Sequence, residues 1–217
     1  MTGRRRKLTL TFDNGPDARV TPLVLDELAR RKLAATFFPV GERLMDLPAR
    51  DLVCRAAREG HRIGNHTYSH PRPFGALAPD DAIREVERTD ALLGDLIEPD
   101  RLFRPSAGGG VLAPGVLNRG VADHLVATRH TLVLWNVICE DWCRPDGSWV
   151  DLALDGIARQ DWAVLVLHDI AGGGMVHLGH FLDRVARTNV EIAPDIAPAC
   201  MPIVRGELKL PIDHLVA

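Results

Sequence analysis

The chain has 217 residues, of which 46% are hydrophobic, so it is long enough to bury one sizeable core. Its 26 basic and 29 acidic residues give a formal net charge of −3, which argues against nucleic acid or an anionic membrane as a partner. No stretch reaches the roughly 18 uncharged apolar residues of a transmembrane helix. The apolar run before Asp13 is too short for a signal-peptide core. We therefore expect a cytoplasmic protein with a single domain over residues 1–217.

Apolar runs of strand length recur along the chain and alternate with helical patterns. Strands are predicted at residues 8–12, 35–40, 62–64, 102–103, 132–138, 163–167 and 190–192. Helices are predicted at residues 21–31, 50–59, 80–96, 149–158 and 178–188. Most of the strands are unbroken apolar runs, which is typical of parallel strands covered by helices. The pattern predicts an α/β fold, either a barrel or a doubly wound sheet.

The glycine runs and the cysteines carry little assignable chemistry. The runs at residues 108–110 and 171–174 lack the spacing of a dinucleotide-binding motif or a P-loop. Four cysteines are too few for a disulfide scaffold in a chain of this length, so free thiols are expected. Cys139 and Cys143 frame the sequence CEDWC, which is half of a zinc site, but no second cysteine pair follows. Structural zinc is therefore the weaker alternative.

Polar side chains follow the predicted strands where each strand ends. These residues are Asp13, His66, His70, Arg104, Asp141 and His168. Sites in α/β barrels and open parallel sheets are built at the carboxyl ends of the strands. We therefore expect these residues to share one pocket.

The stretch HTYSH places two histidines four residues apart, so that His66 and His70 can face one metal ion. In the zinc proteases with the HExxH motif, a glutamate base stands where this chain has Thr67. A base must therefore come from elsewhere, and Asp13 is the available carboxylate. The neighbouring Asn14 offers a neutral carbonyl oxygen to a metal.

The second half of the chain offers an acid to complement this base. Strand alternation puts His168 on one face with Val166, and a histidine among apolar residues is more often structural than functional. Asp141 changes this balance, because a carboxylate can hold an imidazole in its protonated form. Arg104 can likewise hold Asp13 ionised through charge-assisted bonds. This division between an acid and a base is the one that acid–base hydrolysis requires.

Five motifs, in this order, resemble the polysaccharide deacetylases that share the NodB homology domain, also called carbohydrate esterase family four. They are TFDNGP, HTYSH, FRPSAGG, DW and LVLHD, and they run from Thr11 to Asp169. The resemblance implies a distorted (β/α) barrel. It also implies metal-dependent removal of acetyl groups from an N-acetylated sugar or oligosaccharide.

Carried over by position, the resemblance implies that Asp13 is the general base and His168 the general acid. Arg104 would orient Asp13, and Asp141 would tune His168. A backbone N–H after the arginine motif would help to hold the oxyanion.

The same resemblance implies one divalent metal ion held by His66 and His70, with zinc first and Co²⁺, Ni²⁺ or Mn²⁺ as alternatives. Asn14 stands where the family usually has an anionic ligand, so we expect weaker metal binding. Spore-type muramic-acid deacetylases resemble this chain in carrying Asp-Asn-Gly, so the change does not by itself predict an inactive enzyme. The residues expected to line the substrate pocket are Trp142, Val166, Ser106 and Ala107.

A second departure concerns the substrate. Ser106 and Ala107 stand where many sugar deacetylases have a proline and a bulky aromatic, so one wall for a sugar ring is missing. The chain has 5% aromatic residues, which is a poor supply for an extended polysaccharide cleft. A small or medium acetamido sugar is therefore expected rather than a long polymer.

Two alternative functions stay open. One is a cyclic-amide or ureide hydrolase of the same superfamily, although such relatives tend to lose the histidine pair that His66 and His70 represent here. The other is a non-catalytic carbohydrate-binding barrel, suggested by Asn14 and by the missing aromatic. A pure binder has no use for an acid–base pair, so the retained Asp13 and His168 favour an enzyme.

Overall fold

The computed structural model describes residues 5–72 and 74–216, while residues 1–4, 73 and 217 lie outside this description. The strands are β1 (Arg6–Asp13), β2 (Thr36–Phe38), β3 (Arg62–Asn65), β4 (Leu102–Phe103), β5 (Thr131–Leu132), β6 (Val137–Ile138), β7 (Trp162–His168), β8 (Val190–Ile192), β9 (Ile203–Val204) and β10 (Glu207–Leu208). The helices are α1 (Val20–Arg31), α2 (Leu47–Arg58), α3 (Pro79–Leu93), α4 (Arg119–Ala127), α5 (Trp149–Ala158) and α6 (Leu178–Val185). None of these helices combines the length and the apolar character that crossing a membrane requires.

The strands form one curled sheet in the order β10-β9-β5-β4-β3-β2-β1-β7-β6, and β8 pairs with the beginning of β1. Neighbours from β5 to β6 along this order are parallel, whereas β9 joins β5 in the antiparallel direction. Only Val133–Asn136 connects β5 to β6, which lie far apart in the sheet order. Such a link spans at most about 17 Å, so the sheet has to curl. The expected α/β fold, a distorted (β/α) barrel, is confirmed.

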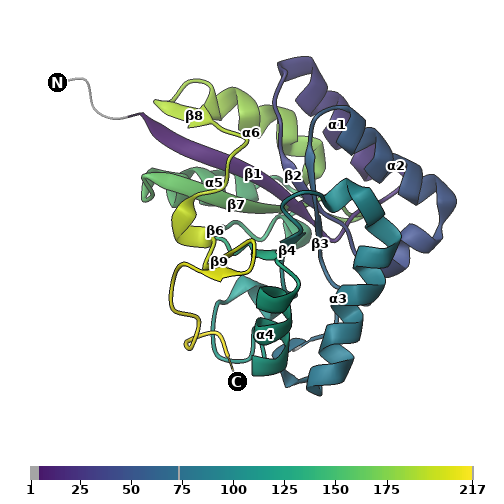
Figure 1. Ribbon diagram of the computed structural model, residues 1–217. Coiled ribbons are helices and arrows are strands. Elements are labelled where there is room, and N and C mark those ends of the chain that lie inside the picture. The colour runs from purple at the N-terminus through teal and green to yellow at the C-terminus, as the bar shows by residue number, and fades with distance from the viewer. Residues whose placement is uncertain (1–4, 73, 217) are drawn as a thin grey trace.

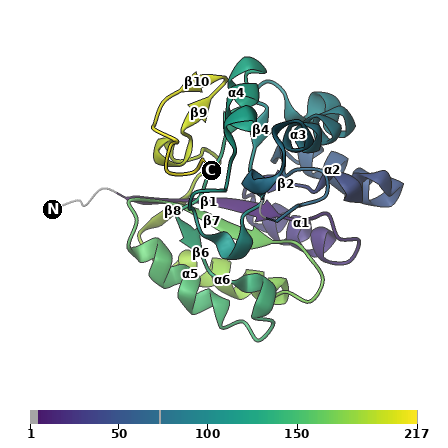
Figure 2. The same cartoon turned by 90° about the horizontal axis from the view of Figure 1, so that it is seen from below.

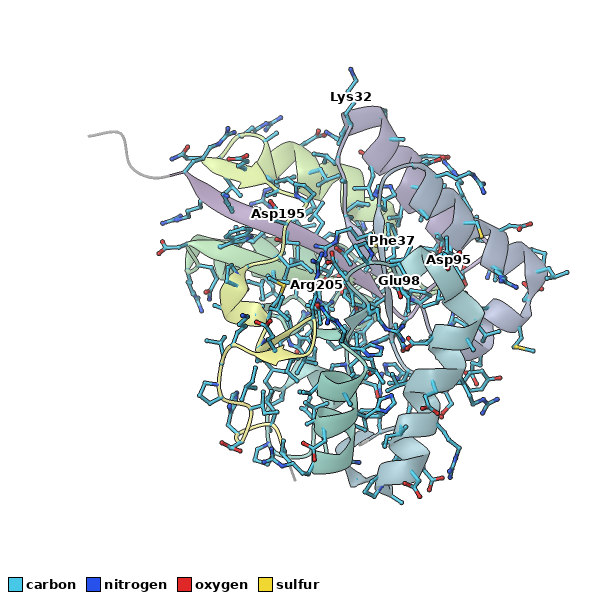
Figure 3. All side chains as sticks on the ribbon, in the orientation of Figure 1. Lys32, Phe37, Asp95, Glu98, Asp195 and Arg205 are labelled. Atoms are coloured by element: carbon cyan, nitrogen blue, oxygen red, sulfur yellow. The ribbon has the colours of Figure 1, made fainter. Side chains whose placement is uncertain are left out.

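The helices cover the outside of the curled sheet. Figure 1 shows β1 running through the centre of the molecule, and Figure 2 shows α5 and α6 on one side of it with α3 and α4 on the other. Figure 3 shows Phe37 of β2 in the interior and Lys32 projecting at the outer end of α1. The chain therefore has a buried layer of strands inside a layer of helices.

Side chains along β1 alternate between an apolar face and a face that carries polar side chains. Leu8, Leu10 and Phe12 are buried in the apolar cluster that includes α1 and α6 residues. Thr11 and Asp13 point to the opposite face, where both accept hydrogen bonds from a buried arginine of the next motif. Alternation with a period of two therefore delivers the last side chain of β1, a carboxylate, to the inside of the barrel.

The strand predicted over residues 132–138 is wrong as a single element. Its two ends pair with different strands, because β5 lies beside β4 while β6 lies beside β7. Between them, the Val133 and Leu134 carbonyls accept from the Arg104 guanidinium, and the Leu134 N–H donates to the Cys200 carbonyl. A crossing segment and a strand both give an unbroken apolar run, so the pattern over residues 132–138 does not show which of the two forms.

Other differences concern element ends and the missed α4, β9 and β10. Helix α3 ends at Leu93 rather than at residue 96, since Gly94 has φ 53° and starts a tighter turn. Helix α6 ends at Val185 rather than at residue 188. The beginning of helix α4 could have been predicted from Asn118, which caps the helix by accepting a hydrogen bond from the Val121 N–H. The remaining predicted strands and helices are confirmed within three residues at each end.

Candidate active site

A cavity opens at the carboxyl ends of the central strands. Its polar wall contains Asp13, Asn14, His66, His70, Arg72 and His168. Its apolar wall includes Trp135, Ile138, Trp142, Val166 and Ile170. Side chains from the ends of β1, β3 and β7 therefore meet in one place, as the position of the motifs predicted. Arg104 and Asp141 lie behind this wall, where each contacts a residue that lines it.

Arg104 and Asp13 form a buried ion pair. Arg104 Nη1 donates to Asp13 Oδ1 at 2.8 Å and to Thr11 Oγ1 at 2.7 Å, and the Arg104 side chain is fully buried. The guanidinium carbon lies 4.2 Å from the centre of the Phe38 ring, which gives a cation–π contact. Burial raises the pKa of Asp13, but the charge of Arg104 and two histidines outweighs it and holds this pKa below its usual value. Asp13 is therefore a carboxylate at neutral pH.

Asp141 holds His168 through two contacts. The fully buried carboxylate accepts from His168 Nδ1 at 2.9 Å and from the His168 backbone N–H at 2.8 Å. Burial lowers the pKa of His168, yet the hydrogen bond and charge of Asp141 outweigh it, so the pKa lies above its usual value. Because Nδ1 donates to Asp141, Nε2 is the nitrogen that remains for proton transfer.

The sheet itself sets the spacing between Asp13 and His168. The two residues are register partners on β1 and β7, which are adjacent parallel strands. Neighbouring strands lie about 4.8 Å apart, so the backbone ladder places the carboxylate beside the imidazole. Seven consecutive residue pairs, from Lys7 with Trp162 to Asp13 with His168, fix this register.

His66 and His70 lie at the same cavity with their rings 4.9 Å apart. His66 Nδ1 donates to the Arg104 carbonyl at 2.9 Å, which leaves a lone pair on Nε2, 3.8 Å from Asp13 Oδ2. Burial lowers the pKa of His66, and burial together with nearby positive charges lowers the pKa of His70 to about 3. Neutral imidazoles are the form that binds metals, and a fixed Nδ1 proton is the usual orientation of a metal-binding histidine.

Asn14 supplies an oxygen at the cavity, as a third donor beside the two histidine nitrogens. Its Oδ1 atom is buried and has no hydrogen-bond partner, although the residue lines the same cavity as the two histidines. A buried amide oxygen without a partner is unfavourable unless a ligand satisfies it. Within residues 5–72 and 74–216, no cluster of three or more His, Cys, Asp or Glu side chains is suited to a metal. A metal at this place would therefore use Asn14 with the histidine pair.

The cysteine stretch forms no second metal site in the described part of the chain. Cys139 is buried, and its Sγ donates to the Val166 carbonyl at 3.7 Å. Cys143 is exposed, and its Sγ donates to the Glu140 carbonyl at 3.4 Å. Both are free thiols, as expected.

The predicted pocket residues divide into two groups. Trp142, Val166 and Ala107 line the cavity, and the Trp142 ring lies edge-on to His168 with centroids 4.8 Å apart. Ser106 requires a correction, because it is 1% exposed and absent from the cavity wall. Its Oγ donates to the Pro71 carbonyl at 2.6 Å, so its side chain supports a neighbouring loop.

Sequence reasoning missed Trp135, which lies on the crossing segment between β5 and β6. Trp135 lines the cavity, and its Nε1 donates to the Gly110 carbonyl at 2.8 Å. This tryptophan supplies an aromatic surface that Ala107 does not. The expectation of a cavity poorly furnished for sugar rings is therefore weakened. A single buried strand over residues 132–138 would place this tryptophan in the core, so the sequence pattern does not reveal its position on the cavity wall.

Asp169 is a second residue whose position the sequence did not reveal. It is 1% exposed, it accepts from Thr21 Oγ1 at 2.5 Å, and its Oδ1 has no partner. Burial raises the pKa of Asp169 to about 7. A Cβ atom at Gly15 would lie 2.2 Å from this carboxyl, so only glycine fits there. The end of β7 is thereby packed against the turn that follows Asp13 and Asn14.

Comparison with known proteins identifies the family. A family model described as polysaccharide deacetylase matches residues 1–113, which is just over half of the chain. The chain belongs to the polysaccharide deacetylase family. The matched part of this chain contains Asp13, Asn14, both histidines and Arg104, whereas Asp141 and His168 follow it in sequence.

Individual relatives extend the similarity over more of the chain. A peptidoglycan-N-acetylglucosamine deacetylase of Bacillus cereus is 30% identical over 184 residues, covering 83% of this chain and 62% of the relative. A chitooligosaccharide deacetylase of Rhizobium leguminosarum is 34% identical over 166 residues, covering 76% and 72%. The chain thus spans less than two thirds of the length of the Bacillus cereus relative.

Solved structures show the same fold. The peptidoglycan deacetylase PdaC of Bacillus subtilis superposes with a TM-score of 0.71 at 27% identity, covering 87% of each chain. This agreement supports the distorted barrel as the fold of this family member.

Proposed function

We propose that this chain is a metal-dependent hydrolase that removes N-acetyl groups from an acetamido sugar or oligosaccharide. The observation that carries the proposal is the pairing of an ionised Asp13 with a His168 whose pKa is raised, on adjacent strands at one cavity. A pair of groups whose environments push their pKa values in opposite directions suits one to act as base and the other as acid.

The residues at the cavity fit a divalent metal ion. His66 and His70 are neutral imidazoles, and the buried Asn14 Oδ1 has no other partner. These residues would hold the ion, which would polarise the amide carbonyl and lower the pKa of a water molecule. Two nitrogens and one oxygen suit zinc first, with Co²⁺, Ni²⁺ or Mn²⁺ as alternatives.

The chemical roles follow from protonation states. Asp13 accepts a proton from the attacking water, and Arg104 keeps its carboxylate ionised and oriented for this step. His168 then gives the proton on Nε2 to the nitrogen of the leaving amine as the C–N bond breaks. Asp141 holds the opposite edge of the imidazole and stabilises its charged form.

The substrate class rests on the cavity wall and on the relatives. Two relatives are named for peptidoglycan N-acetylglucosamine and for chitooligosaccharides, which are both built on N-acetylated hexosamines. Trp142 and Trp135 offer apolar faces on which a sugar ring can pack, and Val166 adds a surface for the acetyl methyl. We therefore propose an N-acetylhexosamine unit, within a short oligosaccharide or alone, as the substrate.

Acetate release tests the proposal. The purified protein, stripped with a chelator and then supplied with Zn²⁺, Co²⁺ or Ni²⁺, is incubated with N-acetylglucosamine, chito-oligosaccharides and muropeptides. Acetate should appear with at least one substrate and only with metal. Asp13→Asn and His168→Ala should lose turnover while ligand binding persists, which separates an enzyme from a binding protein. Metal binding without acetate release from any substrate would contradict the proposal.

A further inference from the structure

The loop that carries the two histidines has an unfavourable backbone conformation. Thr67 and His70 both have positive φ values, 65° and 54° respectively. Residues with side chains rarely adopt this region, and they stay in it only where the surroundings hold them. The conformation lets the rings of His66 and His70 approach to 4.9 Å at the cavity. Contacts that hold this loop therefore affect the positions of both histidines.

Glu85 of α3 holds the centre of the loop. Its Oε2 accepts from the backbone N–H groups of Tyr68 at 2.9 Å and of Ser69 at 2.7 Å. Its Oε1 accepts from Ser69 Oγ at 3.0 Å. One carboxylate thus satisfies two consecutive peptide groups, and both lie between the two histidines in sequence. Figure 1 shows α3 running alongside the strands from which this loop emerges.

A second contact from α3 holds the beginning of the loop. Asn65 Oδ1 accepts from the Thr67 N–H at 2.8 Å, which bridges the residue before His66 to the residue after it. Asn65 Nδ2 donates to the Val86 carbonyl at 2.8 Å and to Asp90 Oδ1 at 2.7 Å. Val86 and Asp90 lie four residues apart on α3 and hold the beginning of the loop, while Glu85, next to Val86, holds its centre. The charged face of α3 therefore contacts the histidine loop and does not only face solvent.

We propose that Glu85 is a positioning residue that fixes the His66–His70 loop and thereby sets the affinity of the histidine pair for a divalent metal ion. This inference rests on the proposed function, in which that pair binds the metal. No hydrogen bond joins Glu85 to either imidazole, and its bonds go to the loop backbone and to Ser69. Its effect therefore acts through geometry rather than through direct coordination.

Two substitutions separate geometry from charge. Glu85→Gln keeps the length of the side chain; its oxygen can accept both N–H groups, and its amino group can donate to Ser69 Oγ. Glu85→Asp keeps the charge but shortens the side chain by about 1.5 Å, so the bonds of 2.7 and 2.9 Å cannot both form. Positioning predicts that Asp weakens binding and Gln retains it, whereas an electrostatic role predicts the reverse.

The measurement is the Kd for Zn²⁺, determined by competition with a chromophoric chelator. Glu85→Asp should raise the Kd about tenfold or more, the scale found for residues that orient metal ligands. Glu85→Gln should stay within about threefold of the wild type. Glu87→Asp is the matched control, since Glu87 lies on the same helix but is exposed and bonds to no part of the loop. A Kd for Glu85→Asp equal to that of the control, or weaker binding in Gln than in Asp, overturns the inference.

Amide hydrogen exchange tests, without metal, whether Glu85 holds the loop between His66 and His70. The N–H groups of Tyr68 and Ser69 should exchange slowly in the wild type and in Glu85→Gln, and faster in Glu85→Asp. If the wild type binds no Zn²⁺, the proposed function fails, while the exchange rates still show whether Glu85 holds the loop. If Zn²⁺ binds and neither exchange nor affinity responds to Glu85→Asp, the positioning role alone fails.

Discussion

Removing Arg104 should destabilise the protein more than removal of any exposed arginine. Arg104→Met keeps an unbranched apolar stem but deletes the donors that face Asp13. The Asp13 carboxylate is 4% exposed, so without its partner it becomes an unpaired buried charge. Breaking one member of a buried ion pair costs about 3–5 kcal/mol. In a chain of this size, such a loss lowers Tm by about 10 °C.

The cost of Arg104→Met should depend on pH. Burial raises the pKa of Asp13, but Arg104 together with His66 and His168 outweighs it and holds the folded-state pKa below its usual value of 3.8. The wild-type pair therefore contributes stability above about pH 4, and this contribution is lost as the pH falls through the folded-state pKa. In the variant, burial is no longer opposed by Arg104, so Asp13 binds a proton at a higher pH than in the wild type. The stability difference should be largest near pH 7 and should shrink towards pH 4.

Urea unfolding followed by tryptophan fluorescence measures this difference. Arg84→Met is the control, because Arg84 is 60% exposed and pairs with Asp81 on the surface of α3. An exposed pair of this kind contributes about 0–1 kcal/mol. Asp13→Asn combined with Arg104→Met removes both charges and should cost less than the two single changes together. If Arg104→Met costs no more than Arg84→Met at pH 7, the buried pair does not have the role assigned to it.

Three further predictions concern Asn14, Asp141 and Asp169. Asn14→Asp should lower the Kd for Zn²⁺ about tenfold, because an anionic oxygen replaces the neutral Oδ1 that now has no partner; isothermal titration measures it. The charge of Asp141 raises the pKa of His168 against the effect of burial, so Asp141→Asn should lower this pKa. The alkaline limb of the kcat profile should then move to lower pH. Asp169→Asn should gain stability relative to the wild type as the pH rises from 5 to 8, as measured by urea unfolding.

The sign for Asp169 follows from linkage. Burial raises its pKa from 3.8 to about 7, so the folded state keeps a proton that the unfolded state releases between these values. Wild-type stability is therefore lost as the pH rises through this window, by at most about 4 kcal/mol. A flat difference between the variant and the wild type across this range would show that Asp169 titrates normally. For Asn14→Asp, an unchanged Kd would show that this side chain does not face the metal, and for Asp141→Asn an unmoved alkaline limb would remove Asp141 from control of His168.

The sequence revealed those site residues whose chemical type and place at a strand end are informative together. Asp13, His66 and His168 each close a predicted apolar run, and parallel strands bring such ends to one edge. Alternation along β7 also predicted correctly that His168 shares a face with Val166, since both line the cavity.

Residues whose role depends on contacts distant in sequence could not be found in this way. Trp135 lies on the wall because its segment crosses between two strands, which an apolar run does not reveal. Glu85 belongs to a charged helix face that, by its pattern, is typical of solvent exposure. Ser106 follows the arginine motif like a pocket residue, yet its hydroxyl bonds to the Pro71 carbonyl. Local pattern specifies the element, whereas the partner of a polar side chain depends on the whole fold.

The seven-pair ladder between β1 and β7 fixes Asp13 and His168 independently of the segments that form the cavity rim. Asp13 and His168 are one strand spacing apart because of backbone hydrogen bonds, and no loop takes part in setting that distance. The cavity rim, by contrast, comes from connecting segments such as the one that contains Gly109 and Gly110 and the one that begins at Ile170. Insertions or exchanges in these segments would reshape the rim while Asp13 and His168 keep their separation. Under the proposed function, exchanging these segments is therefore a way to change which sugar is bound without moving Asp13 or His168.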